Sequence, residues 1–394
     1  MKEDAMTSII QIKAGWLIDG TSAPAAENVI LTIENGVIKS LDHAGPKESA
    51  SILDYSGCTI LPGLTDAHVH LVMSGTTDMA IRETQLFVAY EKSAPVIERH
   101  LKESLKSGVT SIRDGGDWGG HALRFVRENG DIPVMAKCAG KAWRADKRYG
   151  KLVGRPPKDG QTLAGAIAED GQNPDFIKVV GSGLNSLIEF GKQTPPQFSR
   201  EELSQAVQAA KKLGLEIMIH ANGDEPVRIA VEAGCQSVEH GFFMGQDNLK
   251  RMADNGTVWV PTAVTMEGYA QSILDDDPKK AGALKNLDAQ MELISQAREL
   301  GVTMALGTDA GSTGVHHGRS LWREMALFMK AGFSLEEVIC AAAKNGADLL
   351  GLNDQGTIAP CKAATLVMAK GSPQDLPASL QQPAAVMVRG KQVV

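Results

Sequence analysis

The sequence predicts an α/β protein, and two observations support this fold class. After His70, short apolar runs alternate with longer segments of helical periodicity, a pattern typical of βα units around a parallel sheet. Both ends of the chain instead carry short β-branched runs separated by turn residues. We therefore expect a (β/α)8 TIM barrel over residues 63–352, with a small discontinuous β-sandwich domain built from residues 1–62 and 353–394.

The composition is that of an ordinary globular protein, with 43% hydrophobic and 22% charged residues among 394. A net charge of -7 argues against nonspecific binding to nucleic acid or an anionic membrane. No apolar run approaches the roughly 18 residues that span a bilayer, and Met1 to Asp4 lack the pattern of a secretory signal. We expect a cytoplasmic homo-oligomer that acts on a small-molecule substrate.

The cysteines favour the same compartment. There are five, an odd number without C-x-x-C spacing, in a chain too large to need disulfide staples. We expect reduced thiols at all five positions, which are Cys58, Cys138, Cys235, Cys340 and Cys361.

The amino-terminal part should be a small β-sheet. Its apolar runs at 9–13, 29–33 and 37–41 are rich in isoleucine, valine and leucine. Asn35-Gly36 lies between the last two runs, and both residues tolerate the positive φ angles of a tight turn. The pattern predicts a hairpin there.

The barrel requires eight parallel strands, and eight apolar runs are available. The first ends at His70, and the others lie at 109–113, 133–138, 176–180, 216–220, 236–240, 257–260 and 303–307. Between them, Ser199 with Glu202 and Ser334 with Glu337 have the spacing of capping boxes, the latter before a helix over 338–350.

The carboxyl-terminal segment returns to strand-like sequence at 364–369 and 385–391. No room is left for a further βα unit, so we expect these strands to pair with the amino-terminal ones.

A histidine pair ends the first barrel strand. His68 and His70 are one residue apart, so on a strand their side chains point the same way and can bind one metal ion. Alone the pair is weak, because neutral histidines are often satisfied core residues and zinc needs three or four ligands.

Further ligand types follow at the carboxyl ends of later strands, where barrels collect their functional groups. They are Lys178, His220, His240 and Asp309. Lys178 is the most informative, because a lysine within a buried strand costs several kcal/mol unless it is compensated. It could snorkel to solvent, pair with Asp175, or react with carbon dioxide to give an anionic carbamate, which the neighbouring histidines favour.

The order H-x-H, Lys, His, His, Asp on successive strands resembles the amidohydrolase superfamily. The segments 61–71, 175–183, 236–241 and 301–311 resemble its imidazolonepropionase-like and Xaa-Pro dipeptidase (prolidase) branch, and the similarity covers nearly the whole chain.

This resemblance implies a site for two divalent metal ions, usually zinc. It would place His68, His70 and Asp309 on the more buried ion and His220 and His240 on the more exposed one, with carboxylated Lys178 and a hydroxide as bridges. Asp309 would also be the catalytic base that later protonates the leaving amine.

The implied function is metal-dependent hydrolysis of a C–N amide bond, in a dipeptide or an N-acyl amino acid. Deaminases of the superfamily place a Glu three residues after the strand-five histidine, whereas this chain has Gly223 there and Glu225 two positions later. A deaminase or cyclic-amide hydrolase is the alternative, because Glu225 could reach the site by another loop path. A non-catalytic scaffold is disfavoured, since such proteins typically lose ligands and all six are present.

Three residues are candidates for substrate contacts. Arg144 and Tyr149 lie in the loop after the third strand, where cations and aromatics suit a substrate carboxylate. His317 follows the eighth strand and matches a His-Gly pair of the relatives. The remaining histidines, His43, His100 and His121, are expected at the surface.

Overall fold

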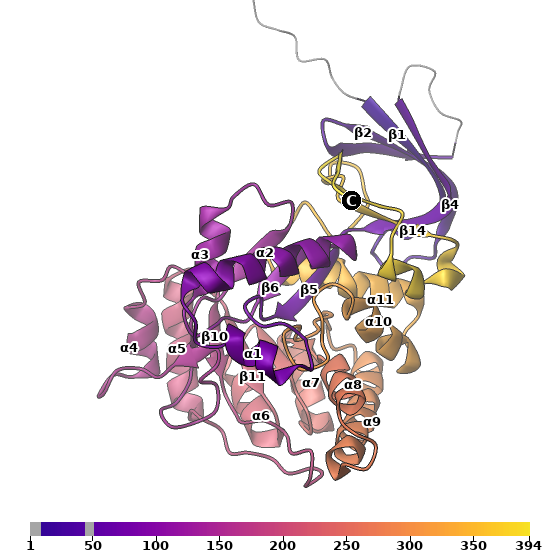
Figure 1. The fold of residues 1–394 in the computed structure, drawn as a ribbon. Coiled ribbons are helices and arrows are strands. Elements are labelled where there is room, and N and C mark those ends of the chain that lie inside the picture. Colours follow the sequence, from indigo (N-terminus) through magenta and orange to yellow (C-terminus); the bar gives the residue numbers. More distant parts are fainter. Residues whose placement is uncertain (1–8, 44–50) are drawn as a thin grey trace, which may run out of the picture.

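A computed structural model describes residues 9–43 and 51–394 of the chain. The segment from Met1 to Asp4, on which the prediction of no secretory signal depends, lies outside these residues. Figure 1 shows an α/β body with a curved sheet at one end, in which strands from both ends of the chain lie together.

The curved sheet has seven strands in the order β16-β15-β14-β4-β1-β2-β3. Strand β14 pairs antiparallel with β4, with Leu366 opposite Pro62, so the carboxyl-terminal strands join the amino-terminal ones as expected. All seven strands form one sheet, so the two-sheet sandwich is not seen in the described residues. The strands are β1 (Ile9–Leu17), β2 (Ala26–Glu34), β3 (Val37–Asp42), β4 (Ser51–Pro62), β14 (Leu366–Lys370), β15 (Ala385–Val388) and β16 (Lys391–Gln392).

The predicted hairpin joins β2 to β3. Glu34 pairs with Val37, and the two turn residues between them have positive φ angles, 50° at Asn35 and 79° at Gly36. The Asn-Gly pair therefore forms the turn for the reason the sequence suggested, because both residues accept the left-handed conformation.

The α/β body contains two parallel sheets, β5-β6-β7 and β13-β12-β11-β10-β8-β9. Seven of the eight expected barrel strands are present among the described residues, and β8 and β9 are short additions. The bounds are β5 (Leu64–Val69), β6 (Val109–Asp114), β7 (Met135–Cys138), β8 (Ala142–Trp143), β9 (Gly154–Arg155), β10 (Ile177–Val180), β11 (Ile217–Ala221), β12 (Ser237–His240) and β13 (Val258–Val260).

The prediction of an eighth strand at 303–307 is wrong, because no regular strand is formed there. This segment makes isolated bridges instead of a ladder, from Met304 to Trp259 of β13 and from Ala310 to Val69 of β5. Its backbone still bonds to both neighbours, because Trp259 donates to the Thr303 carbonyl (3.0 Å) and Ala67 to that of Leu306 (2.9 Å). The segment thus lies between the two sheets, but no closed eight-stranded barrel is formed by continuous pairing in the described residues.

Twelve α-helices are described, and both predicted capping boxes are present, at the starts of α5 and α11. The helix expected over 338–350 is broken at Ala343, which has φ -121° and ψ -74°. No described helix is both long and apolar enough to cross a membrane. The helices are α1 (Met79–Gln85), α2 (Tyr90–Lys106), α3 (His121–Glu128), α4 (Leu163–Ala168), α5 (Arg200–Lys212), α6 (Asp224–Ala233), α7 (Gln246–Asn255), α8 (Val264–Ser272), α9 (Pro278–Glu299), α10 (Leu321–Lys330), α11 (Leu335–Ala342) and α12 (Lys344–Leu349).

Strand β14 connects the two main hydrophobic cores. Val367 and Ala369 belong to the core of the α/β body, whereas Leu366 and Met368 belong to that of the seven-stranded sheet. This division follows from the period of two along a strand, which sends successive side chains to opposite faces.

Candidate metal centre

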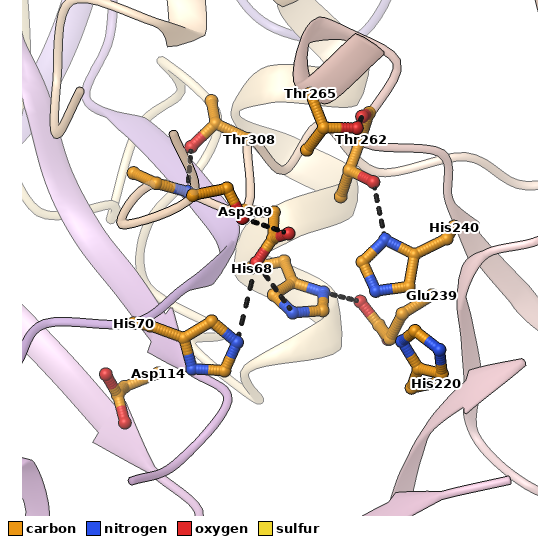
Figure 2. A network of polar contacts seen from close by, with 12 residues as sticks. His68, His70, Asp114, His220, Glu239, His240, Thr262, Thr265, Thr308 and Asp309 are labelled. Atoms are coloured by element: carbon orange, nitrogen blue, oxygen red, sulfur yellow. Dashed lines mark hydrogen bonds and ion pairs between the residues drawn. The ribbon is translucent and has the colours of Figure 1, made fainter. Parts of the chain in front are cut away.

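The six residues expected as metal ligands line one cavity of about 200 Å³ at the carboxyl ends of the parallel strands. Figure 2 shows five of them, His68, His70, His220, His240 and Asp309, directed toward a common centre. Lys178 lines the same cavity from β10.

His68, His70 and Asp309 form the tightest group, with one ligand atom of each within 4.8 Å of the others. His70 donates from Nδ1 to the Gly116 carbonyl (2.8 Å), which leaves its Nε2 facing Asp309 Oδ1 at 3.4 Å. The Nε2 of His68 lies 3.7 Å from the same oxygen.

Glu239 orients His68. Its Oε2 lies 2.7 Å from His68 Nδ1, so that nitrogen is the donor and Nε2 is left free. Arg113 lies 3.3 Å from Oε1 of the same carboxylate, and the side chains of Arg113 and Glu239 are 1% and 0% exposed. The sequence reasoning assigned neither residue a role, although charged side chains within buried strands carry the same signal that singled out Lys178.

The second group comprises Lys178, His220 and His240. The rings of His220 and His240 have centroids 4.6 Å apart, and that of His240 lies 4.9 Å from His68. Lys178 Nζ is buried without a hydrogen-bond partner. The pairing with Asp175 does not occur, because Asp175 instead pairs with Arg127 at 2.9 Å.

Burial sets the protonation states of these groups. Desolvation lowers the pKa of His70 to about 4 and that of His220 to about 3, so both imidazoles are neutral at pH 7. It also lowers the pKa of Lys178 to about 8 and raises that of Asp309 to about 7. Neutral imidazole is the metal-binding form of histidine.

Two of the six residues have strained backbones. His240 and Asp309 have φ angles of 67° and 57°, in the left-handed region that non-glycine residues rarely adopt. The segment around Asp309 is fixed by Asp66, which accepts hydrogen bonds from the Thr308 backbone (2.9 Å) and hydroxyl (2.7 Å). Strain held in place in this way is typical of functional sites.

The residues present fit a bound metal ion. Buried polar atoms without a partner are rare in proteins, yet His68 Nε2 and Lys178 Nζ both lack one here. Gly115 leaves room for the two histidine rings because it has no side chain. A Cβ added there would lie only 2.9 Å from His70 Cε1 and 3.3 Å from His68 Nε2. His68, His70 and Asp309 thus form a candidate metal site.

The predicted substrate contacts are only partly brought to this cavity. Tyr149 lines it, with its ring 5.4 Å from that of His220. Arg144 does not line it, since its Nη1 donates to the carbonyls of Ala145 (2.9 Å) and Arg148 (3.4 Å) and so braces its own loop.

His317 also lies outside the cavity. Its ring stacks on that of His100, with centroids 3.9 Å apart and an angle of 11° between the planes. The expected surface position of His100 is wrong, because the residue is 2% exposed and its Nδ1 lies 2.7 Å from the Leu71 carbonyl. His100 lies on α2, and this helix packs its His100 face against the segment that follows β5.

The sequence reasoning missed several lining residues, among them Arg82, Asn222 and Tyr269. Arg82 lies on α1 and no motif surrounds it, so the sequence carries no signal for it. Glu225, on which the deaminase alternative depends, is exposed on α6 and does not line the cavity.

Fold and site together define an α/β protein with a candidate metal-binding cluster at the carboxyl ends of its parallel strands. The chain belongs to the amidohydrolase family, whose sequence profile matches residues 59–393. Members of this family are hydrolases that act on amide and peptide bonds of small molecules and generally use divalent metals. The resemblance inferred from the strand ends is therefore confirmed.

Similar proteins include a Xaa-Pro dipeptidase and an imidazolonepropionase, the two kinds of protein that define the expected branch. A solved Xaa-Pro dipeptidase with bound methionine in its active site has a TM-score of 0.83 and 28% identity, covering 98% of this chain and 100% of that one. Ochratoxinase of Aspergillus niger is 25% identical over 79% of this chain and 71% of its own length. Imidazolonepropionase of Porphyromonas gingivalis (strain ATCC 33277) is 26% identical over 82% and 77%, respectively.

Proposed function

We propose that the chain is a metal-dependent amidohydrolase that cleaves the C–N bond of a dipeptide or an N-acyl amino acid. The observation that supports this most is the meeting of all six ligand-type side chains in one cavity. The Xaa-Pro dipeptidase similarity supports the same class of bond, and the methionine bound in its active site suggests an amino-acid product for this chain too.

His68, His70 and Asp309 would hold one divalent ion, and His220 and His240 a second, with zinc the metal we expect. When bound, such ions polarise the scissile carbonyl and lower the pKa of the attacking water. Lys178 would join both positions as a carbamate. Its neutral amine, available because its pKa is lowered to about 8, forms an N–C bond with carbon dioxide and releases one proton.

Asp309 is the residue we propose as acid and base. Its carboxylate accepts a proton from the attacking water and passes it to the nitrogen of the leaving amine. Without a bound ion, burial raises the pKa of this carboxyl group to about 7, and a coordinated cation lowers it, so that Asp309 is then the carboxylate that accepts the proton. Ser312 donates to Asp309 Oδ2 at 2.8 Å and leaves Oδ1 on the histidine side.

Lys178→Ala tests the bridging role. We expect loss of metal and of amide hydrolysis, whereas Lys192→Ala, in which an exposed lysine is removed, should change neither. Metal content is measured by elemental analysis of the purified proteins, which also identifies the native metal. Unchanged metal and activity in Lys178→Ala would contradict the carbamate.

The reaction is tested by incubating the zinc-loaded protein with libraries of dipeptides and N-acyl amino acids and measuring released amino acids. Absence of release from every member would contradict the proposal. Ring opening or ammonia release would support the cyclic-amide hydrolase or deaminase alternative, which the similarity to imidazolonepropionase favours and the exposed position of Glu225 disfavours.

A further inference from the structure

We propose that Arg82 binds the carboxylate of the substrate and that the cavity selects N-acyl amino acids over dipeptides with a free amine. This inference rests on the proposed amide hydrolysis and narrows its substrate class. It assigns to α1 the recognition that the sequence led us to expect from the loop at 140–150.

Arg82 is fixed at the cavity wall. Its Nη1 donates to the carbonyls of Ser74 (2.6 Å) and Gly311 (2.9 Å), so one end of the guanidinium is tied to the loops that follow His70 and Asp309. A guanidinium has five N–H donors, and the others are left for a ligand. The side chain is thereby held in place for planar, two-point recognition of a carboxylate.

Arg82 makes no ion pair with a described residue, although its charge and that of Asp309 attract each other across the cavity. No described carboxylate oxygen lies within 4.0 Å of its guanidinium nitrogens, whereas the buried Arg113 near the site pairs with Glu239. Among the described residues that line the cavity, only Arg82 and Lys178 are lysine or arginine, and Lys178 lies among the proposed metal ligands. Apart from the proposed metal ions, Arg82 is therefore the cationic group that a substrate carboxylate would meet in the cavity.

The surroundings complete an anion subsite. Tyr269 lines the cavity from α8. Burial and the nearby Asp309 raise the pKa of its phenol, and the positive charge of Arg82 opposes this rise. The hydroxyl of Tyr269 can donate a second hydrogen bond to a ligand in this cavity. Apolar side chains of Met73, Leu184 and Met266 also line the cavity and suit an apolar amino-acid side chain.

The cavity has no counterpart for an ammonium group. Among its described lining residues Asp309 is the single acid, and the proposed chemistry uses it. The free amine of a dipeptide would be desolvated without a counter-ion, which costs several kcal/mol, whereas an N-acyl group is neutral. The cavity thus offers Arg82 to the substrate carboxylate and, apart from Asp309, no acid to an ammonium group, which favours N-acyl amino acids.

The experiment compares matched probes on the zinc-loaded protein. These are the N-acetyl derivatives of the twenty amino acids, their carboxamides, which lack the carboxylate, and the glycyl dipeptides, which carry the ammonium. For the best N-acetyl amino acid we expect kcat/KM at least tenfold above that of its carboxamide and of its glycyl dipeptide. Equal rates for acid and carboxamide, or a preference for the dipeptide, would overturn the inference.

Variants separate recognition from folding. Arg82→Gln should raise KM for the acid by roughly 10- to 100-fold, as expected for loss of a charge-assisted pair, and leave the carboxamide unaffected. Arg82→Lys should recover part of the loss, because it keeps the charge without the planar donors. Arg99→Gln, at an exposed arginine on α2, is the matched control and should behave as wild type. An equal effect of Arg82→Gln on both probes would show a structural role only.

Binding measured by calorimetry distinguishes failure of this inference from failure of the proposed reaction. If no probe is hydrolysed but an N-acetyl amino acid binds tenfold more tightly than its carboxamide, and only with Arg82 present, the anion subsite stands and the reaction does not. If hydrolysis occurs without this preference, the reaction stands and the subsite does not. Absence of binding by every probe overturns the subsite.

Discussion

At the scale of single residues, buried charge is the feature that marks this site. Lys178, Glu239 and Arg113 all lie in parallel strands that would otherwise be apolar, and each is at most 2% exposed. A buried charge is tolerated when it is paired or neutralised. Glu239 pairs with both Arg113 and His68, whereas Lys178 Nζ has no hydrogen-bond partner among the described residues.

Glu239→Gln should weaken metal binding and destabilise the fold. The neutral amide holds His68 less firmly and leaves Arg113 buried without its counter-ion, so we expect a 10- to 100-fold loss of metal affinity and a loss of roughly 3 kcal/mol in the free energy of unfolding. Metal titration and urea denaturation measure these two quantities.

Glu189→Gln is the control for this variant, because the exposed Glu189 forms a single surface pair with Lys192 (2.8 Å). Its effect on unfolding should stay within about 0.5 kcal/mol. Wild-type metal affinity in Glu239→Gln would show that Glu239 does not position His68.

At the scale of elements, the segment 303–310 carries Asp309 to the site without being a regular strand. Gly307 allows its close approach to β5 and β13, because a Cβ at this position would lie 2.8 Å from the backbone nitrogen of His68 and 2.6 Å from Val260 Cγ1. The absence of a side chain therefore sets the separation between Asp309 and the histidine pair.

Gly307→Ala should push this segment away from β5. We expect a loss of roughly 1–3 kcal/mol in unfolding free energy, typical of overpacking in a core, and weaker metal binding because His68 is displaced. Gly171→Ala is the matched control, since a Cβ there meets no atom within 4 Å and its φ is not in the positive region. If thermal unfolding and metal titration do not distinguish the two variants, the close approach is not needed.

The sequence was informative for elements with a clear period and less so for loops. Apolar runs located seven of the eight barrel strands, and the residues at their ends converge in one cavity, because carboxyl ends of parallel strands meet at one face. Arg82 and Arg144 could not be ranked in this way, since their positions depend on how loops fold back. His100 was misplaced because its burial comes from packing between distant segments.

At the scale of the whole molecule, strand β14 makes the seven-stranded sheet and the α/β body depend on one another. Its successive side chains enter the two different cores. The domain boundaries, the cytoplasmic location and the homo-oligomer stay predictions, as does the identity of the metal.

Val367→Ala and Met368→Ala should destabilise the same cooperative transition, although their side chains lie in different cores. Both residues are 0% exposed, and we expect losses of roughly 1–3 kcal/mol for the valine and 2–5 kcal/mol for the methionine. Calorimetry should show one unfolding peak that moves to lower temperature in each variant. Two separate peaks, each sensitive to one variant, would show that the cores unfold independently.

The hydrogen bonds from Thr308 to Asp66 join positions 242 residues apart in the sequence, next to the two halves of the tightest ligand group. During synthesis on a ribosome, the histidine pair emerges long before Asp309 does. A nascent chain therefore presents only two of these three ligands for most of its translation. The complete group of three can therefore assemble only late in synthesis, once the segment that carries Asp309 has emerged.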